Sequence, residues 1–214
     1  MKPYLLSEFE NFENRIKKAI HAIKSKKGII IIDNKNRENE GDLVFSAEHM
    51  TIEQMALTIR NGSGIVCLCI TEKKRQQLKL PMMVKKNTSK YQTGFTISIE
   101  AASGISTGVS AKDRLKTIKI ASKNHVKESD LNKPGHIFPL CAHSGGVLSR
   151  PGHTEASIEI MNLAKLKPIS VICELTNEDG SMSKINDIIN FSKSYDMPIL
   201  KIDDIIKYLT HYKN

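Results

Sequence analysis

Apolar side chains recur along the chain with two alternating spacings. Between residues 9 and 23 they lie three or four positions apart, as on one face of a helix. After Gly28 comes an unbroken run, Ile29–Ile32, as in a strand buried on both faces. This order of helix and strand continues to the end of the sequence. It predicts an α/β fold of mixed α+β character, a three-layer single domain with helices packed on a mixed twisted sheet.

The same patterns predict the individual elements and their ends. Expected helices cover residues 7–27, 51–61, 71–78, 110–121, 154–164, 185–195 and a last stretch from 203. Expected strands cover residues 29–32, 43–47, 65–70, 95–99, 136–142, 169–175 and 199–202, with polar loops at 33–42, 122–135 and 144–152. Capping boxes pair Ser7 with Glu10 and Thr51 with Gln54. No repeat or linker is visible, so we expect one domain over residues 1–214.

Charge and composition narrow the classes of partner. The formal net charge is +9, but only six of the 32 basic residues are arginines, aromatic residues make up 5% and tryptophan is absent. Proteins that bind nucleic acids favour bidentate arginine contacts and aromatic side chains that stack on bases, so we expect no nucleic-acid partner. No apolar run approaches the length of about 20 residues that a membrane span needs, so we expect no membrane partner.

The N-terminal sequence and the cysteines predict a compartment. The first residues lack the uninterrupted apolar stretch of a signal peptide. We therefore interpret the four cysteines as reduced thiols and expect a cytoplasmic protein.

The first polar loop concentrates charge. Within six residues it carries Arg37, Glu38, Glu40 and Asp42. Three carboxylates this close repel one another unless a cation balances them. Hard oxygen ligands beside an arginine suit Mg²⁺ together with a phosphorylated or polyhydroxylated ligand. A solvated hairpin with Gly41 as its turn residue accounts for the same composition.

The second loop precedes the expected helix at 154–164. Arg150 and the free amides of a helix N-terminus would bind an anion. Thr154 could cap this helix, and His153 could bind a metal or transfer a proton. A plain helix start with a surface histidine is the alternative.

Two further ionisable residues stand beside apolar strands. Glu174 follows an apolar run, where an unpaired buried charge is costly, so it either points to solvent or serves a site. His136 follows Pro134 and Gly135, and a lone histidine is more often structural. The motifs of P-loop enzymes, Rossmann dehydrogenases, zincins and serine hydrolases are absent from the sequence.

Taken together, these loops resemble the 3,4-dihydroxy-2-butanone 4-phosphate synthases of riboflavin biosynthesis. The matching stretches are DNKNRENEGD at 33–42, GIVCLCITEKKRQQLKLPMM at 64–83, TGVSAKDR at 107–114, SDLNKPGHIFPL at 129–140, GGVLSRPGHTE at 145–155 and CELTNEDG at 173–180. They spread over most of the chain. The GTP cyclohydrolase II domain fused to some members has no counterpart in the sequence, so we expect the single-function form.

The resemblance implies a reaction and its requirements. The family converts D-ribulose 5-phosphate into L-3,4-dihydroxy-2-butanone 4-phosphate and formate, by enolisation, dehydration, skeletal rearrangement and loss of one carbon. It implies a lyase that uses Mg²⁺, with Mn²⁺ as a substitute, and a homodimer whose sites lie near the subunit interface.

The resemblance also implies roles for single residues. The implied metal ligands are Glu38 and His153. The implied substrate contacts are Arg37, Glu38, Asp42, Arg150, Pro151, Gly152, His153, Thr154 and Glu174. The implied acid/base groups are His136, Glu174 and Glu40.

The sequence departs from the family pattern at two positions. Pro151 stands where many members have Gly or Ala, and a proline removes an amide donor. Cys141 stands where many members have Arg. Neither position is an implied metal ligand or acid/base group, so we expect the activity to be kept. The competing hypotheses are another Mg²⁺-dependent phosphosugar enzyme, such as an isomerase or aldolase, and a basic nucleic-acid-binding module.

Overall fold

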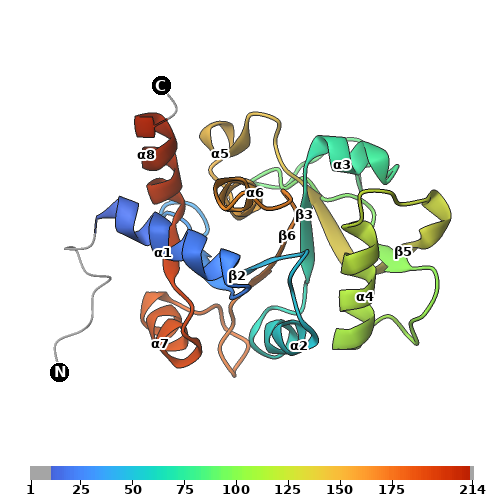
Figure 1. Ribbon diagram of the computed structural model, residues 1–214, viewed down its shortest axis with the longest axis horizontal. Coiled ribbons are helices and arrows are strands. Elements are labelled where there is room, and N and C mark those ends of the chain that lie inside the picture. Colours follow the sequence, from blue (N-terminus) through green and yellow to red (C-terminus); the bar gives the residue numbers. More distant parts are fainter. Residues whose placement is uncertain (1–10, 213–214) are drawn as a thin grey trace.

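The computed structural model describes residues 11–212, which form helices packed on both faces of one mixed sheet (Figure 1). The helices are α1 Phe12–Lys24, α2 Ile52–Asn61, α3 Glu72–Gln77, α4 Ala111–Ala121, α5 Gly146–Ser149, α6 His153–Leu163, α7 Ile185–Tyr195 and α8 Ile202–Tyr212, with a 3₁₀ turn at Glu128–Asp130. The strands are β1 Ile29–Ile32, β2 Gly41–Ser46, β3 Cys67–Ile70, β4 Ile99–Ala101, β5 Leu131–Cys141, β6 Ser170–Glu174 and β7 Ile199–Lys201. The predicted fold class is confirmed.

The seven strands lie in the order β4-β5-β3-β6-β2-β1-β7. The pairs β1–β7 and β3–β5 are parallel, and the other four neighbouring pairs are antiparallel. The predicted mixture of strand directions is therefore present.

Two apolar cores fill the space between the sheet and its helices. The four isoleucines of β1 alternate: Ile29 and Ile31 belong to the core that includes residues of α1, α6 and α8, whereas Ile30 and Ile32 belong to the core that includes residues of α2, α4 and α7. Alternation along a strand buried on both faces explains why this segment is apolar throughout.

Local capping signals decide several helix ends. The predicted box of Thr51 and Gln54 is confirmed, because each side chain accepts a hydrogen bond from the other residue's amide, at 3.3 and 3.0 Å. The predicted box of Ser7 and Glu10 lies outside the described residues. Within them the first helix begins at Phe12, where the Asn11 side chain caps it by accepting from the amide of Asn14.

Three expected segments differ in the structure. The loop expected at 122–135 gives way to β5 at Leu131, because pairing with β4 provides partners for this stretch. Of the strand expected at 95–99, only Ile99 belongs to β4. The backbone of the residues before it forms some hydrogen bonds with β5 and others with the loop at 81–83. One helical turn, α5, interrupts the Gly-rich loop expected at 144–152.

The acidic loop is framed by one end of the sheet. It leaves β1 after Ile32 and enters β2 at Gly41, which pairs with Ile32. Gly41 is therefore a strand residue rather than the turn residue of a hairpin, and the positive φ of the loop is at Asn39, at 56°. β6 ends beside this point at Glu174. Among the described residues, no helix combines the length and apolar character needed to cross a membrane.

Candidate active site

Asp33 folds the acidic loop. Its Oδ2 accepts the amide of Glu38 and its Oδ1 accepts the amide of Glu40, both at 2.9 Å. The Arg37 guanidinium lies 3.1 Å from Oδ2. The Asp33 side chain is fully buried, so these donors replace the water that its carboxylate loses.

Arg37 joins the loop to a distant segment. Its Nη1 binds Glu38, and its guanidinium lies 4.7 Å from the centre of the Tyr91 ring. The Tyr91 hydroxyl donates to the carbonyl of Arg37. A cation–π contact and a hydrogen bond therefore hold the loop against residue 91.

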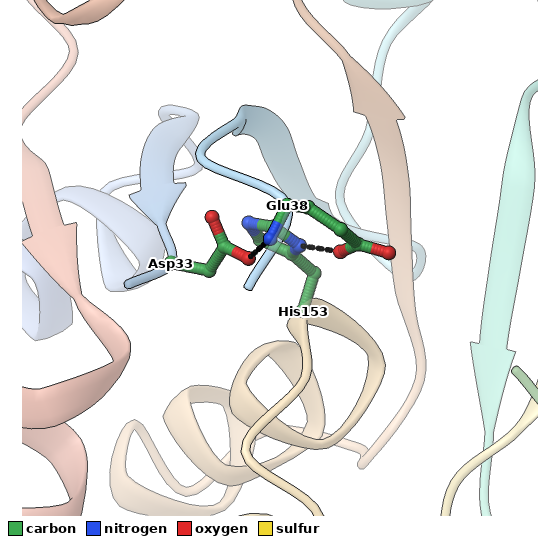
Figure 2. Close-up of side chains that lie close together, drawn as sticks. All are labelled: Asp33, Glu38 and His153. Atoms are coloured by element: carbon green, nitrogen blue, oxygen red, sulfur yellow. Dashed lines mark hydrogen bonds and ion pairs between the residues drawn. The ribbon is translucent and has the colours of Figure 1, made fainter. Parts of the chain in front are cut away.

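His153 points into this loop from the first position of α6 (Figure 2). Its Nδ1 lies 3.6 Å from Glu38 Oε2, and its Nε2 lies 3.7 Å from Asp42 Oδ1. Asp33, Glu38 and His153 each offer a ligand atom within 4.8 Å of the others. The two residues implied as metal ligands, 115 positions apart in the sequence, are thus brought together.

Burial and charge shift the pKa values here. Burial raises the pKa of Asp42 to about 8; the nearby carboxylates of Glu174 and Glu38 add to this rise, and His153 opposes it. Burial alone would lower the pKa of His153, but the charge of Asp42 and the contact with Glu38 raise it to about 9. Asp42 and His153 therefore share a proton at neutral pH.

Glu38 and Glu40 shift in opposite directions. Burial would raise the pKa of Glu38, but His153 and Arg37 lower it. Burial and the charge of Glu38 raise the pKa of Glu40. Glu38 is therefore the carboxylate that stays ionised beside His153 most readily, as a cation ligand must.

Glu174 lies directly beside Asp42 across the β2–β6 ladder. Val44 and Ile172, two residues further along these strands, both face the core under α6, so Asp42 and Glu174 point to that face as well. Glu174 Oε2 accepts a hydrogen bond from Ser63 at 2.5 Å. Glu174 therefore lies beside Asp42, at the end of the acidic loop.

His136 lies further along the same end of the sheet. It precedes the residues of β5 that pair with β3, two strands from Glu174, which corresponds to roughly 10 Å. Its Nδ1 lies 2.6 Å from Glu100 Oε1. His136 is therefore separated from the acidic loop, and its immediate partner is a residue of β4.

Arg150 donates four hydrogen bonds to three protein acceptors. Nη1 binds Glu155 at 2.6 Å, and the rest of the guanidinium donates to the carbonyl of Tyr91 and the hydroxyl of Thr93. The Glu155 side chain is 1% exposed. Arg150 thus ties the segment at 91–93 to the first turn of α6.

The start of α6 differs in detail from the expectation. The helix begins at His153, with Gly152 as its cap, so Thr154 is the second helical residue and does not cap the helix. A Cβ at Gly152 would meet the Arg150–Glu155 ion pair, which explains why a glycine fits here. Pro151 is exposed and Thr154 is buried.

Of the two departures from the family pattern, Pro151 stands two residues before His153, and Cys141 contacts Glu72. The Cys141 thiol lies 3.2 Å from Glu72, and burial followed by this contact raises its pKa to about 12. All four cysteines are free thiols, as expected.

Several residues that build the site carry no role predicted from the sequence. They are Asp33, Ser63, Tyr91, Glu100 and Glu155. Asp33 had a signal, because it is the first polar residue after a buried strand. The others touch partners at least 36 positions away, apart from Glu155, and no local pattern marks them.

Comparisons with known proteins show which family the chain belongs to. The family described as 3,4-dihydroxy-2-butanone 4-phosphate synthase matches residues 17–208. A synthase of that name from Buchnera aphidicola subsp. Acyrthosiphon pisum is 66% identical over 209 residues, which cover 98% of this chain and 97% of the relative.

Two solved structures carry the same name. A synthase in complex with two magnesium ions superimposes with a TM-score of 0.88 at 32% identity, covering 96% of this chain and 99% of the other. A two-domain synthase from A. baumannii gives a TM-score of 0.86 at 40% identity; the match covers 94% of this chain and 58% of that longer one. The chain therefore belongs to the 3,4-dihydroxy-2-butanone 4-phosphate synthase family.

Proposed function

We propose that Glu38 and His153 hold a divalent cation, Mg²⁺ or its substitute Mn²⁺, for the synthase reaction. Membership of the family assigns the chain to riboflavin biosynthesis, at the conversion of ribulose 5-phosphate to 3,4-dihydroxy-2-butanone 4-phosphate. The observation that carries the proposal is the buried imidazole of His153 between the carboxylates of Glu38 and Asp42.

The residues present fit a cation. Among the described residues, His153 Nε2 and Asp42 Oδ1 are buried side-chain atoms without a hydrogen-bond partner. An unpaired buried polar atom is costly and calls for a ligand or an ion. Carboxylate oxygens with one imidazole suit Mg²⁺ and Mn²⁺. The relative that binds two magnesium ions supports the same choice.

The bound cation would stabilise the negative charge that develops when the sugar loses a proton beside its carbonyl. Glu174, His136 and Glu40 are the proposed acid/base groups of the reaction. Their carboxylate oxygens and imidazole nitrogens take up and return protons on different parts of one bound molecule. Asp42 and His153 are themselves buried beside the proposed cation.

The substrate contacts are proposed for both ends of the sugar phosphate. Arg37 and Asp42 would contact hydroxyl groups beside the cation. Arg150, Pro151, Gly152 and Thr154 lie at the start of α6, where helix amides favour an anion. Because Arg150 is already paired with Glu155, its guanidinium would have to bind the phosphate and Glu155 at the same time.

We also propose that residues 1–214 form one synthase domain, that two copies form a homodimer and that the enzyme acts in the cytoplasm. The exposed apolar side chains of Met82, Met83 and Val84 are consistent with a surface covered by a second copy. Light scattering on the purified protein should give twice the mass of the chain, and the mass of a monomer would reject the dimer.

The decisive assay is formate release from ribulose 5-phosphate. We expect release that stops with EDTA and returns with Mg²⁺. Absence of formate under both conditions would reject the synthase reaction. Carbon NMR of the products distinguishes this reaction from that of an isomerase or aldolase, which would leave no one-carbon product.

A further inference from the structure

We propose that Glu100 is a positioning residue that sets the orientation and tautomer of His136. The inference rests on the proposed acid/base role of His136. Its basis is the 2.6 Å contact between His136 Nδ1 and Glu100 Oε1. The Glu100 side chain is 18% exposed and that of His136 is 44% exposed, so the carboxylate is the more enclosed partner.

The chemistry of the pair fixes where the proton sits. An ionised carboxylate only accepts hydrogen bonds, so the nitrogen that faces it must carry a hydrogen. In the neutral imidazole the lone pair is then on Nε2, the nitrogen turned away from Glu100. A histidine whose other nitrogen is bound in this way has one defined basic atom and one ring orientation.

The strands that carry the two residues are shaped for this contact. The β4–β5 register shifts between Ile99, which pairs with Ile137, and Glu100, which pairs with Asn132. Residues 133–136 consequently have no partner in the β4–β5 ladder. A Cβ at Gly135 would collide with the backbone of Ile99, so a glycine lets the two strands approach here. Such irregularities redirect side chains near active sites.

The loop at 104–110 encloses the Glu100 carboxylate. Gly108 has a φ of +84°, and a Cβ there would overlap the carboxylate itself. Asp113 fixes this loop, because its Oδ2 accepts from the amide and hydroxyl of Ser106 and from the amide of Gly108. The backbone of the loop therefore packs directly against the Glu100 carboxylate at Gly108.

Arg114 holds the other side of the pair. Its Nε donates to the carbonyl of Val109 at 2.8 Å, and its Nη1 donates to the carbonyl of His136 at 2.9 Å. One guanidinium thus joins the loop that encloses Glu100 to the backbone of His136. The TGVSAKDR stretch at 107–114, which had no assigned role, acquires one as the support of this pair.

Nitrogen NMR of the histidine rings tests the inference without an activity assay. The chain has seven histidines, and the signals of His136 are identified by their loss in His136→Asn. Spectra are recorded at alkaline pH. In the wild-type protein we expect the hydrogen of the neutral ring on Nδ1. In Glu100→Gln the amide can also donate, so the tautomer with the hydrogen on Nε2 should gain population. A wild-type ring with its hydrogen on Nε2 overturns the proposal.

Kinetics of the same variant give a second readout. We expect kcat of Glu100→Gln to fall about 10- to 100-fold, by analogy with the loss of a group that orients a metal-bound histidine. KM should change less than about threefold, because Glu100 is not a substrate contact. Unchanged kcat with a changed tautomer would show that the orientation has no catalytic role.

A matched pair of glycine variants separates strain from contact. Gly104 and Gly108 both have positive φ values in one loop, +73° and +84°. An added Cβ at Gly104 meets only the end of Lys116, at 3.2 Å, whereas one at Gly108 displaces Glu100. Gly108→Ala should shift the tautomer and lower kcat as Glu100→Gln does, and Gly104→Ala should do neither. Equal behaviour of the two variants contradicts the proposal.

Failure of this inference differs from failure of the proposed function. If the wild-type enzyme releases no formate, the function fails, while the NMR result still decides whether Glu100 sets the tautomer. If the wild-type enzyme is active and neither the tautomer nor kcat responds to Glu100→Gln, only the inference fails.

Discussion

Two regions of the site use different physical means to prepare a side chain. We define the acidic flank as Asp33, Glu38, Asp42 and His153, and the histidine flank as Glu100 and His136. In the acidic flank His153 and Asp42 are 6% and 2% exposed, and both have raised pKa values. In the histidine flank the imidazole is 44% exposed and directly hydrogen-bonded to a carboxylate.

The difference shows which region depends on something from outside the chain. In the acidic flank two buried polar atoms, His153 Nε2 and Asp42 Oδ1, have no hydrogen-bond partner. The histidine flank has its partner within the protein. We therefore expect changes in the acidic flank to alter cation binding, and changes in the histidine flank to alter only the chemical step.

The largest expected effect is in the acidic flank. Glu38→Ala and His153→Ala should each lower turnover at least about 100-fold, because each removes a proposed cation ligand. Initial rates of formate release at saturating Mg²⁺ measure this. His125→Ala, which changes an exposed histidine outside the site, is the control. Near-normal turnover in either ligand variant would remove that residue from the cation site.

A smaller effect is expected from the residue that folds the acidic loop. Asp33→Asn should raise the Mg²⁺ concentration for half-maximal activity about tenfold. The asparagine side chain cannot accept the three hydrogen bonds that the Asp33 carboxylate accepts from two backbone amides and the Arg37 guanidinium. Asp196→Asn changes an aspartate on the surface and should leave that concentration unchanged. An equal shift in both variants would mean that the loop does not depend on Asp33.

Cation affinity should rise with pH. The pKa of His153 is raised from 6.5 to about 9 and that of Asp42 from 3.8 to about 8, so this buried pair shares a proton at pH 7. A cation must displace that proton, so raising the pH from 7 to 9 removes its competitor. Mn²⁺ titrations should show affinity rising by up to about tenfold per pH unit per displaced proton. A flat profile would contradict the shared proton.

The smallest effect on activity is expected at Arg150. Arg150→Ala should mainly raise the apparent KM, by roughly a few fold, because a phosphate contact binds ground and transition states alike. It should also lower the free energy of unfolding by about 3 kcal/mol, since Glu155 would stay buried without its cation.

A second variant separates the two roles of Arg150. Adding Glu155→Gln to Arg150→Ala should recover stability in urea titrations while KM stays high. Recovery of KM together with stability would show that Arg150 supports the fold only. A change confined to kcat would also reject the phosphate contact.

The sequence predicted elements well where a local pattern controls them. The helix at 185–195 and the strand at 29–32 match α7 and β1, because spacing and flanking residues decide both. β5 was predicted to start at 136 but begins at Leu131, since pairing with β4 outweighs the breaking effect of Pro134. Interactions between distant segments set such ends.

The site residues show the same contrast between local patterns and interactions of distant segments. Glu38 and His153 were predicted from a charged loop and a helix start that resemble a known family. Glu100 was not, because it lies 36 positions before His136 and directly follows the alternating strand expected at 95–99. Only the β4–β5 pairing and the loop at 104–110 bring its carboxylate to the imidazole.

Anomalous diffraction at the manganese absorption edge, from crystals grown with Mn²⁺, locates the proposed cation itself. We expect a peak between the Glu38 carboxylate and the His153 imidazole. Ordered manganese elsewhere, with no peak between these two side chains, would contradict this expectation.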